Sequence, residues 1–321
     1  MKPYEEITDF DREIWQEELE DFVPAKIFDA HTHLWEQNFC KTPTKYQNIN
    51  FDILDSWSKE VFPNRELDYQ LIAMPDIGID FDKQNEFMAN EIAKTRNHIG
   101  CTAITPDVTP ERLENAIKQY GFTGLKPYRT MAKDPANCRI TDYFGEDLIE
   151  VADEYKLSVT MHMSRFDGIA DPDNLADFKY FTSKYKNVRW ILAHCARAFN
   201  PFTLEKNIFA LRDMPNIFYD TSAVCDARSI YLLFKHEDFS RIMFGTDNII
   251  AGGVHAKYIT WGKGWQYFTG MDVPHCRPDV TLVCYENLRA TKQAADMAGI
   301  TDKQLQDFFY GNAKNFFNLK D

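Results

Sequence analysis

The sequence predicts a single (β/α)8 barrel, and three features of the chain support this fold class. Short apolar runs alternate with amphipathic stretches along most of the 321 residues, which is the rhythm of strand–helix units on a parallel sheet. Eight such runs occur, more than an open doubly wound sheet usually needs. The G-x-G-x-x-G turn of the dinucleotide-binding alternative is absent. An α/β barrel of this length is ordinary.

The strands and helices follow from the hydrophobic pattern, taken in chain order. The expected strands are the apolar runs Lys26–His31, Tyr69–Met74, His98–Thr105, Thr123–Tyr128, Leu157–Met163, Val188–His194, Ile217–Thr221 and Arg241–Asp247. Apolar residues recur at spacings of three and four between these runs, which predicts helices. The predicted helices include Asp82–Arg96, Pro110–Tyr120, Asp142–Tyr155, Asn174–Tyr185 and Leu204–Met214.

Two regions flank or interrupt this pattern. We expect residues 26–321 to form the barrel domain and the acidic residues 1–25 to form a helical extension that closes the barrel bottom or serves an oligomer contact. Irregular stretches at 34–50 and 249–277 follow the first and last strands. Barrel enzymes build their sites from loops at the carboxyl ends of strands, so both stretches are expected at the site.

Composition excludes several classes of protein. With 36 basic and 49 acidic residues the net charge is −13, which argues against binding nucleic acid or an anionic membrane surface. The first 21 residues are strongly acidic, unlike a signal or transit peptide, and no apolar run approaches the ~18 residues of a membrane span. Seven cysteines without a C-x-x-C pair do not predict a disulfide framework. We expect a cytoplasmic protein.

The strongest chemical signal is the segment Phe28-Asp29-Ala30-His31-Thr32-His33 at the end of the first strand. Residues i and i+2 of a strand point to the same face, so His31 and His33 project together. Two neutral imidazoles in that position can bind one divalent cation, with nitrogens at ~2.1 Å if the ion is zinc. An isolated H-x-H is common in proteins, and its position before a loop is what makes a metal site the better interpretation.

Three other polar residues end apolar strands in the same way: His162, His194 and Asp247. A buried polar group without a partner costs several kcal/mol, so each needs a reason to be there. One such residue alone would be a hydrogen-bonded core histidine or a helix cap. Together with His31 and His33 they converge on one barrel mouth, which favours a metal site.

The sequence resembles the metal-dependent amidohydrolase superfamily, in particular the amidohydrolase-related branch that includes aminocarboxymuconate-semialdehyde decarboxylase. The resemblance rests on Asp29-Ala30-His31-Thr32-His33, on Ala193-His194, on Arg241-Ile242-Met243-Phe244-Gly245-Thr246-Asp247, and on the tail Gly311-Asn312-Ala313-Lys314-Asn315-Phe316, which is similar to a closing helix. These motifs extend from residue 28 to residue 316. They are specific for the family but not for the reaction.

The resemblance implies one or two divalent ions, zinc in the first place and manganese as an alternative. His31, His33, His162 and Asp247 would be ligands, and His194 would be a further ligand or an acid–base group. Asp247 would also accept a proton from the attacking water.

Lys126 ends the fourth strand, and its role stays open. In two-metal members of the superfamily a lysine at this place is carboxylated and bridges the ions. His31, His33 and Asp247 would then bind one ion, and His162 with His194 the other. As a plain ammonium, Lys126 would instead bind a substrate carboxylate or have a structural role.

Further residues near the strand ends are candidates for substrate binding. Arg129, Arg165 and Arg197 follow Lys126, His162 and His194 within three residues, and arginine binds carboxylates through two parallel hydrogen bonds. The alternative for each is a surface salt bridge. The segment 251–265 combines glycines with aromatics, which predicts a lid carrying His255 or Trp261, or alternatively a dimer contact.

Three functions compete. The first is metal-dependent hydrolysis of a small, carboxylate-bearing amide, lactone or related molecule, with Asp247 and His194 as catalytic residues. The second is nonoxidative decarboxylation of an aromatic or unsaturated carboxylic acid at the same site. The third is a metal-stabilised scaffold without catalysis. A homodimer is expected, partly from the family resemblance.

Overall fold

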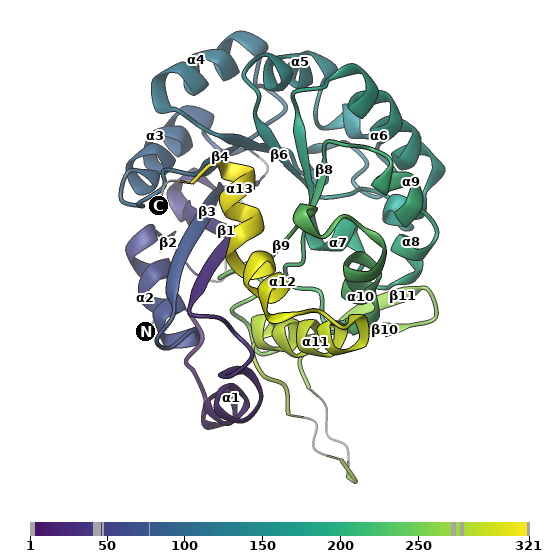
Figure 1. Ribbon diagram of the computed structural model, residues 1–321. Helices are drawn as coiled ribbons and strands as arrows, with labels where there is room; N and C mark the ends of the chain where they lie inside the picture. The colour runs from purple at the N-terminus through teal and green to yellow at the C-terminus, as the bar shows by residue number, and fades with distance from the viewer. Residues whose placement is uncertain are drawn as a thin grey trace.

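The barrel is closed by eight parallel strands. The computed structural model describes residues 4–40, 46, 48–76, 78–270, 274–276 and 279–319. Its main sheet has the order β2-β1-β3-β4-β5-β6-β7-β8-β9, in which β2 alone is antiparallel. The chain after β9 lies beside β1, where the amide of Asp247 donates to the carbonyl of His31 at 2.8 Å and that of Ala30 to Phe244 at 3.0 Å. These bonds join the two edges of the sheet (Figure 1), so the predicted fold class is confirmed.

Each predicted strand overlaps an observed one, but β1 extends further than expected and β3 begins three residues earlier than expected. The strands of the main sheet are β1 (Lys26–Glu36), β2 (Asn48–Ile49), β3 (Glu66–Ala73), β4 (Gly100–Ala103), β5 (Gly124–Lys126), β6 (Ser158–Met161), β7 (Arg189–Leu192), β8 (Ile217–Asp220) and β9 (Ile242–Met243). The parallel register of β1 against β3 shifts between Asp29 and Thr32, an irregularity that contains His31 and lies just before His33.

Helices cover the outside of the barrel (Figure 1). The larger ones are α2 (Phe51–Val61), α3 (Phe81–Ile92), α4 (Pro110–Tyr120), α5 (Glu146–Glu154), α6 (Pro172–Lys184), α10 (Ala227–His236) and α11 (Val283–Ala298). α4 has the predicted bounds because Thr109 caps its first turn, Pro110 opens it and Gly121 ends it at φ 70°. The single helix predicted at Leu204–Met214 is wrong, since the chain forms two short helices there, α8 (Phe202–Glu205) and α9 (Ile208–Arg212).

The barrel bottom is closed by the C-terminal end of the chain. The short helix α12 (Asp302–Gln306) leads through a π-helical turn to α13 (Asn312–Phe317), which lies across the barrel in Figure 1. The Asn312 side chain donates to the carbonyls of Phe239 and Ile242, which fixes this helix next to β9.

The N-terminal extension does not close the bottom, contrary to one of the two expectations for it. It contains α1 (Asp9–Ile14) and the π-helical turn Trp15–Leu19, and lies at the rim between α2 and α11 (Figure 1). Trp57 of α2 donates to the carbonyl of Glu5, and Arg289 of α11 pairs with Glu18 at 2.8 Å. Apolar side chains of the extension, Trp15 and Leu19 among them, are buried in the main core.

The two loops predicted at the site are more regular than expected. The first begins only after Glu36, and β2 pairs back onto β1, while residues 41–45 and 47 lie outside the described residues. The second contains an antiparallel hairpin of β10 (Lys257–Trp261) and β11 (Gly264–Phe268). Among the described residues, the structure contains no helix that is both long and apolar enough to span a bilayer.

Candidate active site

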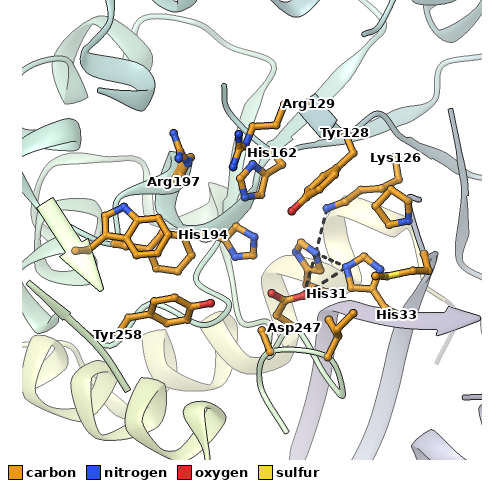
Figure 2. A pocket seen from close by; sticks show the side chains of 16 residues that line it. His31, His33, Lys126, Tyr128, Arg129, His162, His194, Arg197, Asp247 and Tyr258 are labelled. Atoms are coloured by element: carbon orange, nitrogen blue, oxygen red, sulfur yellow. Dashed lines mark hydrogen bonds and ion pairs between the residues drawn. The ribbon is translucent and has the colours of Figure 1, made fainter. Parts of the chain in front are cut away.

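Three side chains meet at the mouth of the barrel (Figure 2). The Nε2 atoms of His31 and His33 lie 3.2 Å apart. An Oδ1 atom of Asp247 lies 3.4 Å from Nε2 of His33 and 3.7 Å from Nε2 of His31. His31 and His33 belong to β1, and Asp247 belongs to the segment after β9. These two parts of the chain lie side by side where the sheet closes into a barrel.

This triad has the dimensions of a metal site. Ligand atoms bound to one ion at ~2.1 Å lie about 3.0 to 3.4 Å apart in octahedral or tetrahedral geometry. The distances of 3.2 and 3.4 Å fall in this range, and the 3.7 Å between Asp247 and His31 lies slightly above it. Two imidazole nitrogens and one carboxylate oxygen are a donor set that suits zinc or manganese. The residues present therefore fit a divalent ion.

Hydrogen bonds on the far side of three imidazoles leave their Nε2 atoms available. His31 Nδ1 lies 2.9 Å from Oδ2 of Asp220, His162 Nδ1 lies 3.1 Å from the carbonyl of Met163, and His194 Nδ1 lies 2.9 Å from the carbonyl of Ser222. Each of these oxygens accepts a hydrogen bond from Nδ1–H, so the neutral ring carries its lone pair on Nε2. Proton-accepting nitrogens facing the cavity are what a metal or a proton transfer requires.

Asp220 and Ser222 connect two of these histidines. Asp220 is buried at the end of β8; it accepts from His31 and also from the backbone amide of His194 at 3.1 Å. The Ser222 hydroxyl lies 2.9 Å from His194 Nδ1 and 3.2 Å from His31 Nδ1. Burial alone would raise the pKa of Asp220, but the adjacent His31 holds it well below its ordinary value. The ionised carboxylate therefore fixes the orientation of both rings.

His194 reaches the cavity through an unusual backbone turn. Residues His194, Cys195, Ala196 and Arg197 have φ values between 53° and 60°, in the left-handed region. This conformation costs about 1–2 kcal/mol per residue with a side chain, so surrounding contacts must impose it. The turn brings both His194 and Arg197 to the cavity and turns Cys195 into the core.

Lys126 lies inside the site, with Nζ 3.1 Å from Nε2 of His31. Its side chain is buried, and burial lowers the pKa of its ammonium. The position is within reach of the triad, as both expectations for this residue require. Its state as an amine or a carboxylated amine stays a prediction.

The electrostatics of the site favour neutral imidazoles beside the ionised carboxylates of Asp220 and Asp247. Burial, together with the charge of Lys126, lowers the pKa of His31 to about 4. Burial likewise lowers the pKa of His33 and His162. Asp247 is also desolvated, but its hydrogen bond with His33 and the nearby His31 keep its pKa below the ordinary value.

The cavity above these residues measures about 280 Å³. Besides the triad, its lining consists of Met74, Pro75, Lys126, Tyr128, Arg129, His162, His194, Arg197, Phe199, Ile250, Ala251, Tyr258 and Trp265. The hydroxyls of Tyr128 and Tyr258 face the interior (Figure 2). The structure thus brings together the five predicted ligands, Lys126, Arg129 and Arg197.

Three candidate substrate-binding residues lie elsewhere, so those predictions need correction. Arg165 turns to the surface, where Asp171 and Asp173 pair with it. His255 lies between Glu5 at 2.6 Å and Asp11 at 2.8 Å, where two carboxylates of the N-terminal extension hold it. Trp261 is at the hairpin tip with 55% of its surface exposed, and Trp265 of the same hairpin lines the cavity instead.

Sequence reasoning missed several residues of the site. Asp220 ends an apolar strand, so the rule that selected His162 and Asp247 would have found it. Tyr128, Tyr258 and Trp265 gave no comparable signal, because their inward orientation depends on the hairpin and on the loop after β5.

Comparison with known proteins agrees with this fold. The family model Amidohydro_2, described as amidohydrolase, matches residues 28–319, and the chain therefore belongs to this family. No curated protein sequence matches the chain.

Solved structures of low sequence identity share the fold. 4-Oxalomesaconate hydratase from Rhodopseudomonas palustris is 16% identical, with 91% of this chain and 95% of that chain covered and a TM-score of 0.52. 5-Carboxyvanillate decarboxylase from Sphingomonas paucimobilis is 11% identical, with 92% and 100% covered and a TM-score of 0.53. Dihydroxybenzoic acid decarboxylase from Polaromonas, with bound manganese and the inhibitor 2-nitroresorcinol, is 15% identical, with 92% and 97% covered and a TM-score of 0.54.

Proposed function

We propose that this protein is a metal-dependent hydrolase that cleaves a C–N or C–O bond in a small, carboxylate-bearing molecule. The observation that carries the proposal is the convergence of imidazole lone pairs and one ionised carboxylate, all proton acceptors, at the mouth of the barrel. Hydrolysis needs such an acceptor because the attacking water must lose a proton.

A divalent ion bound by His31, His33 and Asp247, with His162 or His194 as a further ligand, would supply Lewis-acid activation of the reacting groups. Zinc or manganese suits these donors, and one of the structural neighbours contains manganese. The number of ions depends on the state of Lys126.

The chain's own residues account for the proton transfers. Asp247 accepts the proton of the attacking water and returns it to the leaving nitrogen or oxygen as the C–N or C–O bond breaks. His194 presents a lone pair, so it serves as a ligand or base rather than as a donor to the developing oxyanion. The hydroxyls of Tyr128 and Tyr258 are placed to donate to that oxyanion.

Decarboxylation of an aromatic or unsaturated acid is the second candidate. It is favoured by the cationic lining of the cavity, with Lys126, Arg129 and Arg197 against the single carboxylate of Asp247. Two of the three solved structures described above are decarboxylases. In that reaction Asp247 or His194 would first take up a proton from water and then deliver it to the carbon that loses CO2.

One experiment separates these functions. The metal-loaded protein is incubated in 18O-labelled water with panels of aryl amides, lactones and aromatic acids. Incorporation of 18O into a product supports hydrolysis, and release of CO2 without incorporation supports decarboxylation. Asp247→Asn is the control, since an enzyme loses turnover in this variant while a scaffold is indifferent to it. A cytoplasmic location and a homodimer remain proposals for the same protein.

A further inference from the structure

Two arginines in the cavity have no acidic partner. Among the residues that the structure describes, no carboxylate lies within ion-pair distance of Arg129 or Arg197. One terminal nitrogen of Arg129 donates to the carbonyl of Pro135 at 2.9 Å, and one of Arg197 donates to the carbonyl of Arg165. The Nε atoms of both are buried without a hydrogen-bond acceptor.

Burying these two guanidinium groups is unfavourable unless an anion binds to them. Buried N–H donors without acceptors are disfavoured, and two nearby guanidinium groups repel each other. Burial and the charge of Arg129 lower the pKa of Arg197 to about 10. In a chain with a net charge of −13, leaving two cations unpaired in one cavity points to a ligand. Arg165, which is outside the cavity, also has a buried Nε without an acceptor, but unlike the two cavity arginines it pairs with two carboxylates, those of Asp171 and Asp173.

The arginines occupy a separate end of the cavity. Figure 2 shows both guanidinium groups beside His162, with His194 lying between them and the group formed by Asp247, His31 and His33. An anion bound by Arg129 and Arg197 therefore belongs to a part of the substrate other than the part that faces the triad.

An aromatic wall connects the two ends. The ring of Phe199 lies 4.5 Å from that of Tyr258, 4.8 Å from that of Trp265 and 5.3 Å from that of His194, measured between centroids. Flat aromatic surfaces of this kind pack best against a planar, unsaturated body.

We propose that Arg129 and Arg197 bind a non-reacting carboxylate of a planar, unsaturated substrate, and that they determine substrate specificity at the end of the cavity opposite the triad. This inference rests on the proposed function for the location of the reacting bond. It assigns the arginines to recognition and not to bond cleavage.

The test uses benzoate as the planar carboxylate, benzamide as its neutral counterpart and cyclohexanecarboxylate as its non-planar counterpart. Binding to the metal-loaded protein is measured by ligand-observed NMR titration. Benzoate is expected to bind more tightly than both counterparts. Arg129→Met and Arg197→Lys are each expected to weaken benzoate binding about 10- to 100-fold, because they remove charge-assisted hydrogen bonds. Arg197→Lys keeps the positive charge, so it should preserve the left-handed turn at His194–Arg197.

Arg165→Met is the matched control and should leave benzoate binding unchanged. Equal binding of benzoate and benzamide, or benzoate binding that survives both cavity variants, would overturn the inference. Metal content is determined on the same samples. A full complement of metal with unaffected benzoate binding refutes the role of the arginines alone, whereas a lack of metal in the wild-type protein refutes the proposed function.

Discussion

The two ends of the barrel are made from the same strands but hold opposite kinds of side chain. At the bottom, Phe28 of β1 stacks on Phe317 of α13 with 5.2 Å between ring centroids, in a cluster that includes Ile191 and Met243. At the top, His31, His194 and Asp247 follow those residues by three or four positions along the same strands. Three or four residues along each chain segment therefore separate the side chains that pack at the barrel bottom from those that form the candidate active site. Stability and activity should therefore respond to different substitutions.

The largest expected effect is at the top. Asp247→Asn keeps the shape of the side chain but removes the proton acceptor, so turnover should fall about 10²- to 10⁴-fold. The urea midpoint of unfolding should fall at most slightly, because the side chain keeps its shape and only the interactions that lower the pKa of Asp247 are lost. Steady-state assay of the identified substrate and equilibrium unfolding measure the two quantities. A variant that unfolds easily would show that the two ends are not separable.

The corresponding substitution at the bottom is Phe28→Ala. Phe28 is fully buried, and loss of such a ring costs about 3–5 kcal/mol of unfolding free energy. Metal content and turnover of the protein that remains folded should be unchanged. Phe209→Ala, at a side chain that is 60% exposed, is the control and should have little effect on stability. A loss of metal in Phe28→Ala would contradict the comparison.

A smaller effect is expected just beneath the triad. Asp220→Asn weakens the hydrogen bond that orients His31, and metal affinity should fall about 10- to 100-fold. Competition with a chromophoric chelator measures this affinity. Ser222→Ala is the milder variant and should lower the affinity less, since the carbonyl of Ser222 still holds His194. Unchanged affinity in both variants would limit Asp220 to a structural role.

The smallest effect concerns the N-terminal extension, which reaches the top rim from outside. Hydrogen bonds with Asp11 and Glu5 raise the pKa of His255 above 6.5. The stabilisation from protonated His255 is thus complete below pH 6.5 and is lost as pH rises through the higher folded-state pKa. Burial opposes ionisation of Asp11, but its hydrogen bonds with His255, Thr281 and Thr8 lower its pKa to about 2, so its contribution is present above pH 3.8 and lost toward pH 2.

The difference in unfolding free energy between wild type and His255→Gln tests this pH dependence. The difference should be greatest between pH 4 and 6.5 and should shrink at higher pH. A difference that stays constant across this range would show that the charge of His255 does not matter.

Much of the fold was predictable because barrel strands and helices are local patterns. Strand ends marked by His162, His194 and Asp247 identified the mouth of the barrel, and α4 carried complete capping signals. The split between α8 and α9 was not predictable from apolar spacing, which continues across both helices. Closure of the barrel bottom by the extension, one of the two expectations for it, was wrong because its apolar residues indicate that it packs on the core but not on which side.

Site residues on strands were predictable because the strand fixes the direction of their side chains. Residues on loops were less predictable because the loop conformation sets that direction. His31, His33 and Lys126 lie on strands and are where the pattern put them. Arg165 and Arg197 looked equivalent, yet a left-handed turn directs Arg197 inward while Asp171 and Asp173 hold Arg165 outside. His255 depended on acidic residues about 250 positions earlier in the chain, a distance at which no sequence pattern specifies contact.

The most direct test of the account is metal content per chain, measured by plasma mass spectrometry on protein purified without chelator in bicarbonate buffer. We expect about one divalent ion per chain, bound at the triad. About two would indicate a carboxylated Lys126 and a binuclear hydrolase. The matched variant His33→Ala should lose the ion, whereas Arg165→Met should keep it. No bound ion, even after zinc and manganese are offered, would contradict the assignment of His31, His33 and Asp247 as a metal site.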